Sequence, residues 1–102
     1  MNYRINVTTT ATADIQGIYD QIAEDSPAAA ERITDLLNSS IKAAVDFPKR
    51  YPLAPESSRE STEIRQMIVG SYRILFRIIG DTLHILRVRH CAQQMLKPGE
   101  LN

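Results

Sequence analysis

Arginines and a histidine gather in one short stretch near the end of the chain, RILFRIIGDTLHILRVRHC (residues 73–91). The side chains of interest are Arg73, Arg77, Arg87, Arg89 and His90. Guanidinium groups hold phosphates and stabilise developing negative charge, and an imidazole gives or takes protons near neutral pH. If the chain is an enzyme, this combination predicts metal-free cleavage of RNA, with the substrate's own 2′-hydroxyl as the nucleophile.

The other residue types give no recognisable site for a metal or a cofactor. The two histidines and the single cysteine lack the spacing of metal ligands. The sequence has no glycine loop that would cradle a phosphate and no nucleophile elbow. Cys91 has no base and no orienting group that the sequence can assign to it. We therefore expect no metal, no cofactor and no covalent catalysis by the cysteine.

Length and composition are ordinary for a soluble globular protein. The chain has 102 residues, of which 43% are hydrophobic and 24% charged, so we expect one domain over residues 1–102. A single cysteine excludes an internal disulfide and fits a reducing cytoplasm. The first residues lack the apolar region of a signal peptide, and no apolar run approaches a membrane span of about 18 residues. The expected location is the cytoplasm, away from membranes.

The net charge of zero hides a segregation of charge along the chain. Residues 1–62 hold six Lys or Arg and nine Asp or Glu, a balance of −3. Residues 63–102 hold six Lys or Arg and three Asp or Glu, a balance of +3. The basic part suggests an acidic partner, either protein or nucleic acid. The alternative is that the two parts neutralise each other within the fold.

Hydrophobic periodicity predicts one strand and two helices in the first half of the chain. Apolar and polar residues alternate over 3–8, as in a half-buried strand. Apolar residues at helical spacing then predict helices over 11–25 and 27–47. Gly17 weakens the first helix but permits close packing on a neighbour. The tight connection between the helices favours an antiparallel helical hairpin.

Local signals mark where these helices begin and end. The threonines at 8–10 are candidate caps of the first helix, and Asp14 would lie favourably in its first turn. Ser26 is the candidate cap of the second helix, and Pro27 suits its first position. That helix is expected to end before Pro48, because a residue that precedes proline avoids the α region.

Three further strands are expected over 63–69, 72–78 and 83–89. Gly70-Ser71 and Gly80-Asp81 lie between them and are typical of two-residue hairpin turns. The predicted fold class is α+β, with an N-terminal strand and a helical hairpin packed on a curved antiparallel sheet. The expected order of elements is β-α-α-β-β-β.

The connection between the helices and these strands, residues 48–62, is long for a small domain. It contains three prolines and a run of small polar residues, which predict a surface loop. Long ordered loops often carry function, so its charged residues are candidates for a role: Lys49, Arg50, Glu56 and Arg59.

The turn at Gly80-Asp81 predicts which side chains of the last hairpin share a face. A two-residue turn places five residues on the face opposite the helices: Arg73, Arg77, His84, Val88 and His90. Arg73 and His90 would then be near neighbours. Arg87 and Arg89 come out on the helix side. Either the helices leave that end uncovered, or a β-bulge switches the phase.

Several strings, in this order, resemble the ParE/RelE superfamily of bacterial type II toxins, most closely its ParE-like branch. They are ADIQGIYDQIAEDSPAAAERITDLL, FPKRYPLAPE, EIRQMIVGSYRILFRI and ILRVRH, and the resemblance extends over most of the chain. It implies an antitoxin partner, which wraps the toxin and neutralises it. It also implies one of two modes of action. ParE-like members are described as poisons of DNA gyrase, whereas RelE-like members cut mRNA in the ribosomal A site.

Residue by residue, the resemblance favours the ParE-like branch. Arg73 matches the arginine of the family's YR strand, and His90 lies close to a C-terminal histidine of some nuclease members. Two lysines that RelE itself has before that strand correspond to positions near Ile64 and Gln66, and its later arginine falls near Cys91. No tyrosine follows His90, although nuclease members often have one there.

We therefore expect a growth-inhibiting toxin of the plasmid-stabilisation type that binds DNA gyrase, without catalysis, through the basic end of the sheet and the C-terminal tail. The expected contacts are Arg87, Arg89, His90, Gln93 and Gln94. The alternative is a ribosome-dependent mRNA endonuclease that uses Arg73 and His90, assisted by Arg65 or Arg89. A third alternative is a degenerate toxin that only binds its antitoxin and represses its operon, reaching operator DNA through the antitoxin. An acidic or amphipathic antitoxin segment is expected to lie along residues 73–91.

Overall fold

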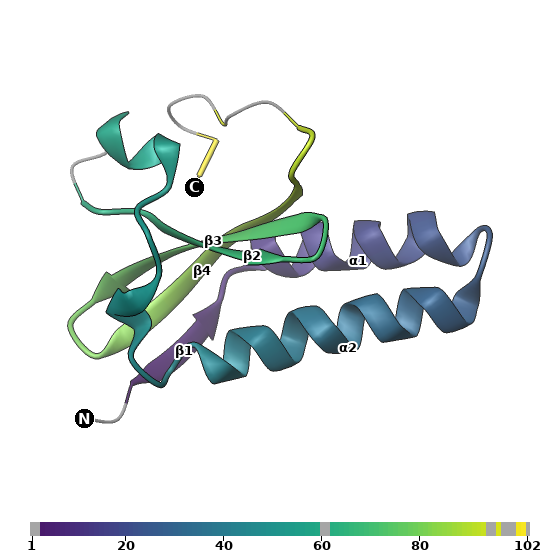
Figure 1. The fold of residues 1–102 in the computed structure, drawn as a ribbon, viewed down its shortest axis with the longest axis horizontal. Coiled ribbons are helices and arrows are strands. Elements are labelled where there is room, and N and C mark those ends of the chain that lie inside the picture. The colour runs from purple at the N-terminus through teal and green to yellow at the C-terminus, as the bar shows by residue number, and fades with distance from the viewer. Residues whose placement is uncertain (1–2, 60–61, 94–95, 97–99, 102) are drawn as a thin grey trace.

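The computed structural model describes residues 3–59, 62–93, 96 and 100–101. The elements within them are β1 (Arg4–Val7), α1 (Thr9–Ala23), α2 (Pro27–Ala43), the 3-10 helices η1 (Pro48–Arg50) and η2 (Pro55–Arg59), β2 (Arg65–Val69), β3 (Tyr72–Ile79) and β4 (Thr82–His90). The strands form one sheet in the order β1-β4-β3-β2, and the helical hairpin lies on one of its faces (Figure 1). The α+β class and the order β-α-α-β-β-β are thus confirmed.

The sheet is mixed, because β1 runs parallel to β4 whereas the other neighbouring strands are antiparallel. The expectation of a wholly antiparallel sheet is therefore wrong at this strand. Parallel neighbours require a long connection, and the two helices and the β2–β3 hairpin supply it here. β1 pairs with only the first part of β4, from Arg4 opposite Thr82 to Val7 opposite Ile85. The outer edge of β4 beyond Ile85 is left for other partners.

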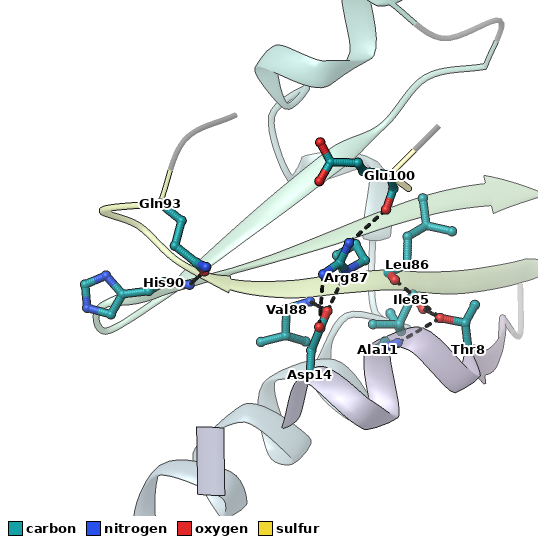
Figure 2. Close-up of polar contacts among 10 residues, drawn as sticks. All are labelled: Thr8, Ala11, Asp14, Ile85, Leu86, Arg87, Val88, His90, Gln93 and Glu100. Carbon is teal, nitrogen blue, oxygen red and sulfur yellow. Dashed lines mark hydrogen bonds and ion pairs between the residues drawn. The ribbon is translucent and has the colours of Figure 1, made fainter. Parts of the chain in front are cut away.

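Thr8 joins β1 to α1 and caps the helix, as predicted. Its hydroxyl accepts a hydrogen bond from the Ala11 amide (3.2 Å) and donates one to the Ile85 carbonyl (2.7 Å). One side chain therefore closes the helix N-terminus and holds it on β4 (Figure 2). Because α1 begins directly after Thr8, Asp14 lies beyond its first turn, and the expected placement of that carboxylate is wrong.

Ser26 caps α2 by accepting a hydrogen bond from a backbone amide of the first turn (3.1 Å), and a proline follows it, as predicted. The helix ends at Ala43 rather than at residue 47. The next four residues form a turn, and Phe47 adopts the left-handed conformation with φ 57° before Pro48 opens η1. The helix therefore ends before Pro48, as the proline predicted, but earlier than expected.

Glycines form the turns of both antiparallel hairpins. Gly70 and Gly80 have φ angles of 58° and 60°, which only glycine adopts without strain. Between them, β2 and β3 pair without interruption, from Arg65 opposite Phe76 to Val69 opposite Tyr72. Both predicted hairpin turns are therefore confirmed.

The pairing of β3 with β4 contains one irregularity. Phe76 lies opposite Ile85, whereas its neighbour Leu75 lies opposite Arg87. Leu86 is therefore an extra residue in β4, a β-bulge. Because side chains alternate along a strand, the extra residue moves every later side chain of β4 to the other face of the sheet.

The sheet carries an apolar core on each face. The core beneath the helices contains Ala11, Leu37, Ile41, Ala44, Met67, Ile74, Phe76, Leu83, Ile85 and Val88. The opposite face, called here the second face, lies beneath η2 and the C-terminal residues (Figure 1). Its core contains Ala54, Ile64, Leu75, Leu86, Leu96 and Leu101. Ala54 and Glu56 of the predicted surface loop and the described C-terminal residues Leu96 and Leu101 are therefore packed parts of the fold.

A buried ion pair anchors the long connection on the second face. Glu56 of η2 is 1% exposed and Arg73 of β3 is 8% exposed. The guanidinium donates to both carboxylate oxygens, at 2.9 and 2.5 Å, and the Leu96 amide donates to the same carboxylate at 3.0 Å. Burial alone would raise the pKa of Glu56, but these hydrogen bonds outweigh it and hold that pKa below its ordinary value of 4.5. One carboxylate thus joins the connection, the sheet and the C-terminal segment.

Glu56→Ala is expected to destabilise the fold by about 3 kcal/mol, because it leaves the Arg73 guanidinium buried without a countercharge. Urea denaturation followed by circular dichroism measures the loss. The double variant Glu56→Leu/Arg73→Met removes both charges and is expected to recover most of the stability. If the double variant is no more stable than Glu56→Ala, the loss of stability in the single variant does not come from the unpaired charge of Arg73.

The same pair predicts sensitivity to acid. The pKa of Glu56 is lowered in the fold, so its carboxylate contributes stability that is fully present above pH 4.5 and lost as the pH falls through the lower folded-state value. The thermal midpoint should therefore drop from pH 7 to pH 3, and drop less in Glu56→Gln, which does not titrate. Equal drops in the two proteins would assign the acid sensitivity to other carboxylates.

Candidate functional site

The β-bulge gathers the arginines of the last hairpin on the second face of the sheet. Arg73 lies opposite Arg89, and Leu75 of the second core lies opposite Arg87. Residues that face each other across an antiparallel pair share a face of the sheet. Of the two alternatives left by the sequence, the phase switch is therefore the observed one. It brings Arg87 and Arg89 to the second face, where Arg73 and Arg77 of β3 already lie.

The same bulge separates Arg73 from His90, which the sequence predicted to be neighbours. His90 lies opposite Tyr72, and the two rings meet edge to face with centroids 5.3 Å apart. Since successive residues of a strand alternate, His90 lies on the helix side and Arg73 on the second face. The expectation that Val88 and His90 share the face of Arg73 is therefore wrong. The string LHILRVRH gives no local sign of the extra residue that causes this.

Arg73 is occupied by partners within the chain. Besides Glu56, its guanidinium donates to the Gln66 side chain at 3.2 Å. The hydrogen bonds to Glu56 raise the pKa of Arg73 despite its burial. To meet a phosphate, this arginine must first leave Glu56.

Arg87 reaches over the free edge of β4 to α1 (Figure 2). It donates to both oxygens of Asp14, from Nε at 2.7 Å and from Nη2 at 3.1 Å, and the Val88 amide donates to the same carboxylate at 3.0 Å. Its Nη1 atom donates to the Glu100 carbonyl at 2.8 Å. The hydrogen bonds to Asp14 are the main cause of the raised pKa of Arg87. Arg87 therefore ties α1, β4 and the C-terminal segment together.

Arg65 lies away from His90 and holds a different part of the chain. Arg65 lies opposite Phe76 of β3, whereas His90 lies opposite Tyr72. Phe76 and Tyr72 are four positions apart, which is about 14 Å along the strand. The Nη1 atom of Arg65 donates to the carbonyls of Lys49 (3.1 Å) and Tyr51 (2.7 Å), and Nη2 lies 3.5 Å from Glu63. Arg65 thus clamps η1 onto the start of β2.

Arg89 keeps a donor that the described part of the chain does not satisfy. Its Nε atom is buried and has no hydrogen-bond partner among the described residues. It lies opposite Arg73, whose charge Glu56 already neutralises. Among the described residues, Arg89 therefore forms no ion pair of its own.

His90 is the last residue of β4 and forms two short-range hydrogen bonds. Its ring Nδ1 atom accepts from the Ala92 amide (3.0 Å), and its own amide donates to the Gln93 side chain (2.9 Å; Figure 2). Because Nδ1 is an acceptor, the neutral ring carries its proton on Nε2. His90 and Gln93 are both exposed, so the ring and the amide face solvent in a fixed arrangement. Gln94, the remaining expected contact, lies outside the described residues.

A hollow of about 570 Å³ opens between α1 and this end of the sheet. Its lining includes Gly17, Ile18, Gln21, Tyr72, His90 and Gln93. A Cβ atom on Gly17 would meet nothing within 4 Å, so close packing within the chain does not explain the glycine. A glycine in a helix costs up to about 1 kcal/mol relative to alanine. Gly17 therefore leaves the helix backbone bare where α1 lines this hollow.

Two carboxylates that position these arginines were not recognised as their partners from the sequence. Asp14 had a readable sign, since it lies three residues after Ala11 and four before Ile18, on the apolar stripe of α1. A carboxylate at such a position indicates a buried partner. Glu56 had no comparable sign, because it stands in a run of polar loop residues.

The chemistry available at this end of the sheet is hydrogen bonding and charge. Within residues 3–59, 62–93, 96 and 100–101, no group of three or more His, Cys, Asp or Glu side chains is placed to hold a metal ion. Across that described part of the chain, none of the helices has the length and apolar character needed to span a membrane.

Comparison with known proteins places the chain in a family. The sequence profile of the family described as "ParE toxin of type II toxin-antitoxin system, parDE" matches residues 5–95. Toxin RelE2 of Caulobacter vibrioides is 33% identical over 86 residues, covering 84% of this chain and 92% of the relative. Toxin RelE1 of the same organism is 26% identical over 95 residues, covering 92% and 99%.

Two solved structures are similar to this one. A structure titled "Chromosomal ParDE TA system from P. aeruginosa" has a TM-score of 0.72 at 21% identity, covering 86% of this chain and 95% of that chain. The toxin–antitoxin complex RelBE2 from Mycobacterium tuberculosis has a TM-score of 0.51 at 29% identity, covering 88% and 99%. Together with the profile match over residues 5–95, these findings show that the chain belongs to the ParE toxin family of type II toxin–antitoxin systems, within the ParE/RelE superfamily.

Proposed function

We propose that the chain is a growth-inhibiting toxin that binds and poisons DNA gyrase and is neutralised by a cognate antitoxin. The observation that carries the proposal is that two of the three arginines expected in a nuclease are held by acceptors of the chain. Arg73 is paired with Glu56, and Arg65 donates to two backbone carbonyls. Metal-free cleavage needs cations that are free to stabilise the charge on a phosphate. The choice of gyrase rests on the ParE-like resemblance.

The contact surface that we propose is the exposed end of β4 and the hollow beside it. Arg89, His90 and Gln93 are its contact residues, with the charge of the Arg89 guanidinium, the imidazole Nε2–H and the Gln93 side-chain amide as binding groups. Arg87 has a positioning role beside this surface, because its guanidinium is held by Asp14 and by the Glu100 carbonyl. Such groups can bind a folded protein target by direct hydrogen bonds around the hollow.

The antitoxin proposal is supported by the solved relatives, which are titled as a ParDE toxin–antitoxin system and as a RelBE2 toxin–antitoxin complex. An acidic or amphipathic segment laid along residues 73–91 would give Arg89 a carboxylate. It would also fill the hollow beside Gly17, where the helix backbone is bare. Blocking this surface excludes the target, which is how one segment would neutralise the toxin.

A second candidate function is mRNA cleavage at the ribosome, because both curated relatives are named RelE toxins. His90 supports it, since the Nε2 atom of an exposed, fixed imidazole is suited to proton transfer. Arg89 would be the assisting cation. Arg73 would take part only after its ion pair with Glu56 had opened.

Induction of the chain in a bacterial host without antitoxin tests the mode of action. We expect growth to stop while transcript 5′ ends stay unchanged, because no RNA is cut. The purified chain should inhibit supercoiling by gyrase. New 5′ ends at fixed positions within translated codons would overturn the gyrase proposal in favour of cleavage. Undisturbed growth, with both assays negative, would leave a degenerate toxin that binds only its antitoxin.

His90→Ala is expected to raise the concentration that half-inhibits gyrase about tenfold, because it removes a fixed donor at the centre of the proposed surface. His84→Ala is the matched control, since His84 is the other histidine of β4 and bonds Asn6 at the far side of the sheet. Circular dichroism checks that both variants fold. Equal inhibition by the two variants would exclude the end of β4 as the contact surface.

A further inference from the structure

Phe47, between α2 and η1, combines backbone strain with exposure. Its φ and ψ angles are 57° and 59°, in the left-handed region that a bulky residue rarely adopts. Its side chain is 79% exposed, so no burial within the chain compensates for the strain. Glycine or asparagine would be the ordinary residue after a helix in this conformation. A strained residue that gains nothing within its own chain indicates a contact outside it.

The segment that follows holds Phe47 rigidly in place. Pro48 is fully buried, and Tyr51 packs edge to face against Phe76 of the core, with ring centroids 5.8 Å apart. Arg65 donates to the carbonyls of Lys49 and Tyr51, on both sides of the intervening residue. Strain persists only where the surroundings over-determine the conformation, and these contacts do so.

The groups around the ring indicate what it binds. A hollow of about 630 Å³ lies beside Phe47, and its polar lining includes Lys49, Arg50 and Asp46. Lys49 and Arg50 are exposed, and neither forms an ion pair with a residue in the described part of the chain. The Arg50 guanidinium lies 4.9 Å from the Tyr51 ring centre and donates to its hydroxyl at 2.8 Å, which orients it in advance. Two exposed cations, of which Arg50 is oriented in advance, thus outnumber one carboxylate beside an exposed ring.

We infer that this corner binds single-stranded nucleic acid, with a base stacked on Phe47 and the backbone phosphates paired with Lys49 and Arg50. An exposed aromatic face beside free cations is how proteins bind unpaired strands without reading their sequence. The corner is separate from the surface at His90. Lys49 shares a smaller hollow with Gly80 at the β3–β4 turn, whereas His90 is the last residue of β4, at the other end of that strand.

Fluorescence anisotropy with labelled 12-nucleotide oligo(dT) and oligo(U) tests the inference on the full chain. We expect both strands to bind, with an affinity that falls as salt is added. Phe47→Gly should weaken binding at least tenfold, because one stacked base is lost. The same variant should keep its thermal midpoint or raise it by up to about 4 °C, because glycine adopts positive φ without strain. Phe47→Trp should restore binding.

Ile68→Ala is the matched control, because Ile68 is an exposed apolar residue on the edge strand β2, 58% exposed. It should bind as the unsubstituted chain does. Absence of binding by the unsubstituted chain, or full binding by Phe47→Gly, would overturn the inference. A fall in the thermal midpoint of Phe47→Gly would do so too, since the ring would then serve the fold. Displacement of the strands by polyglutamate at equal charge concentration would instead assign the corner to an acidic protein. None of these outcomes depends on gyrase.

Discussion

One extra residue in β4 decides how the cationic end of the sheet is built. Without the bulge at Leu86, alternation would direct Arg87 and Arg89 beneath α1, where an unpaired guanidinium is costly. With it, Leu86 enters the second core and Val88 completes the core under the helices. The two arginines then lie where carboxylates, carbonyls and solvent can reach them. A strand with this much charge can therefore lie between two apolar cores.

The opposite charges of the two parts of the sequence meet in this arrangement. Asp14 and Glu56 come from the acidic first part, and they pair with Arg87 and Arg73 of the basic second part. Each carboxylate also accepts a hydrogen bond from a backbone amide. Each pair therefore positions the backbone in addition to neutralising the charge of an arginine. For these two pairs, the interpretation that the halves neutralise each other is correct. Among the described residues, Arg89, Lys49 and Arg50 form no ion pair with a carboxylate.

Signals that act over a few residues made the elements predictable. The caps at Thr8 and Ser26 and the turns at Gly70 and Gly80 each depend on one residue and its nearest backbone. The face of Arg87 and Arg89 was not predictable in the same way, because it depends on a bulge whose extra residue, leucine, is an ordinary apolar strand residue like Ile85 before it. The ion pairs join residues far apart in sequence, and no local pattern connects them. The fold class could therefore be predicted from the sequence, whereas the arrangement of the site became known only from the pairing register of β3 and β4.

The difference between held and free cations limits what this end of the sheet can do. Moving Arg73 away from Glu56 would leave a buried carboxylate unpaired, at a cost of several kcal/mol that a phosphate contact must supply. Arg89 has no such carboxylate among the described residues, and His90 and Gln93 are already fixed and exposed. A partner can therefore bind these three residues without rearranging the second core, whereas a reaction that uses Arg73 must open the contact that joins η2, β3 and the C-terminal segment. Target binding is the role that requires the smaller change in this structure.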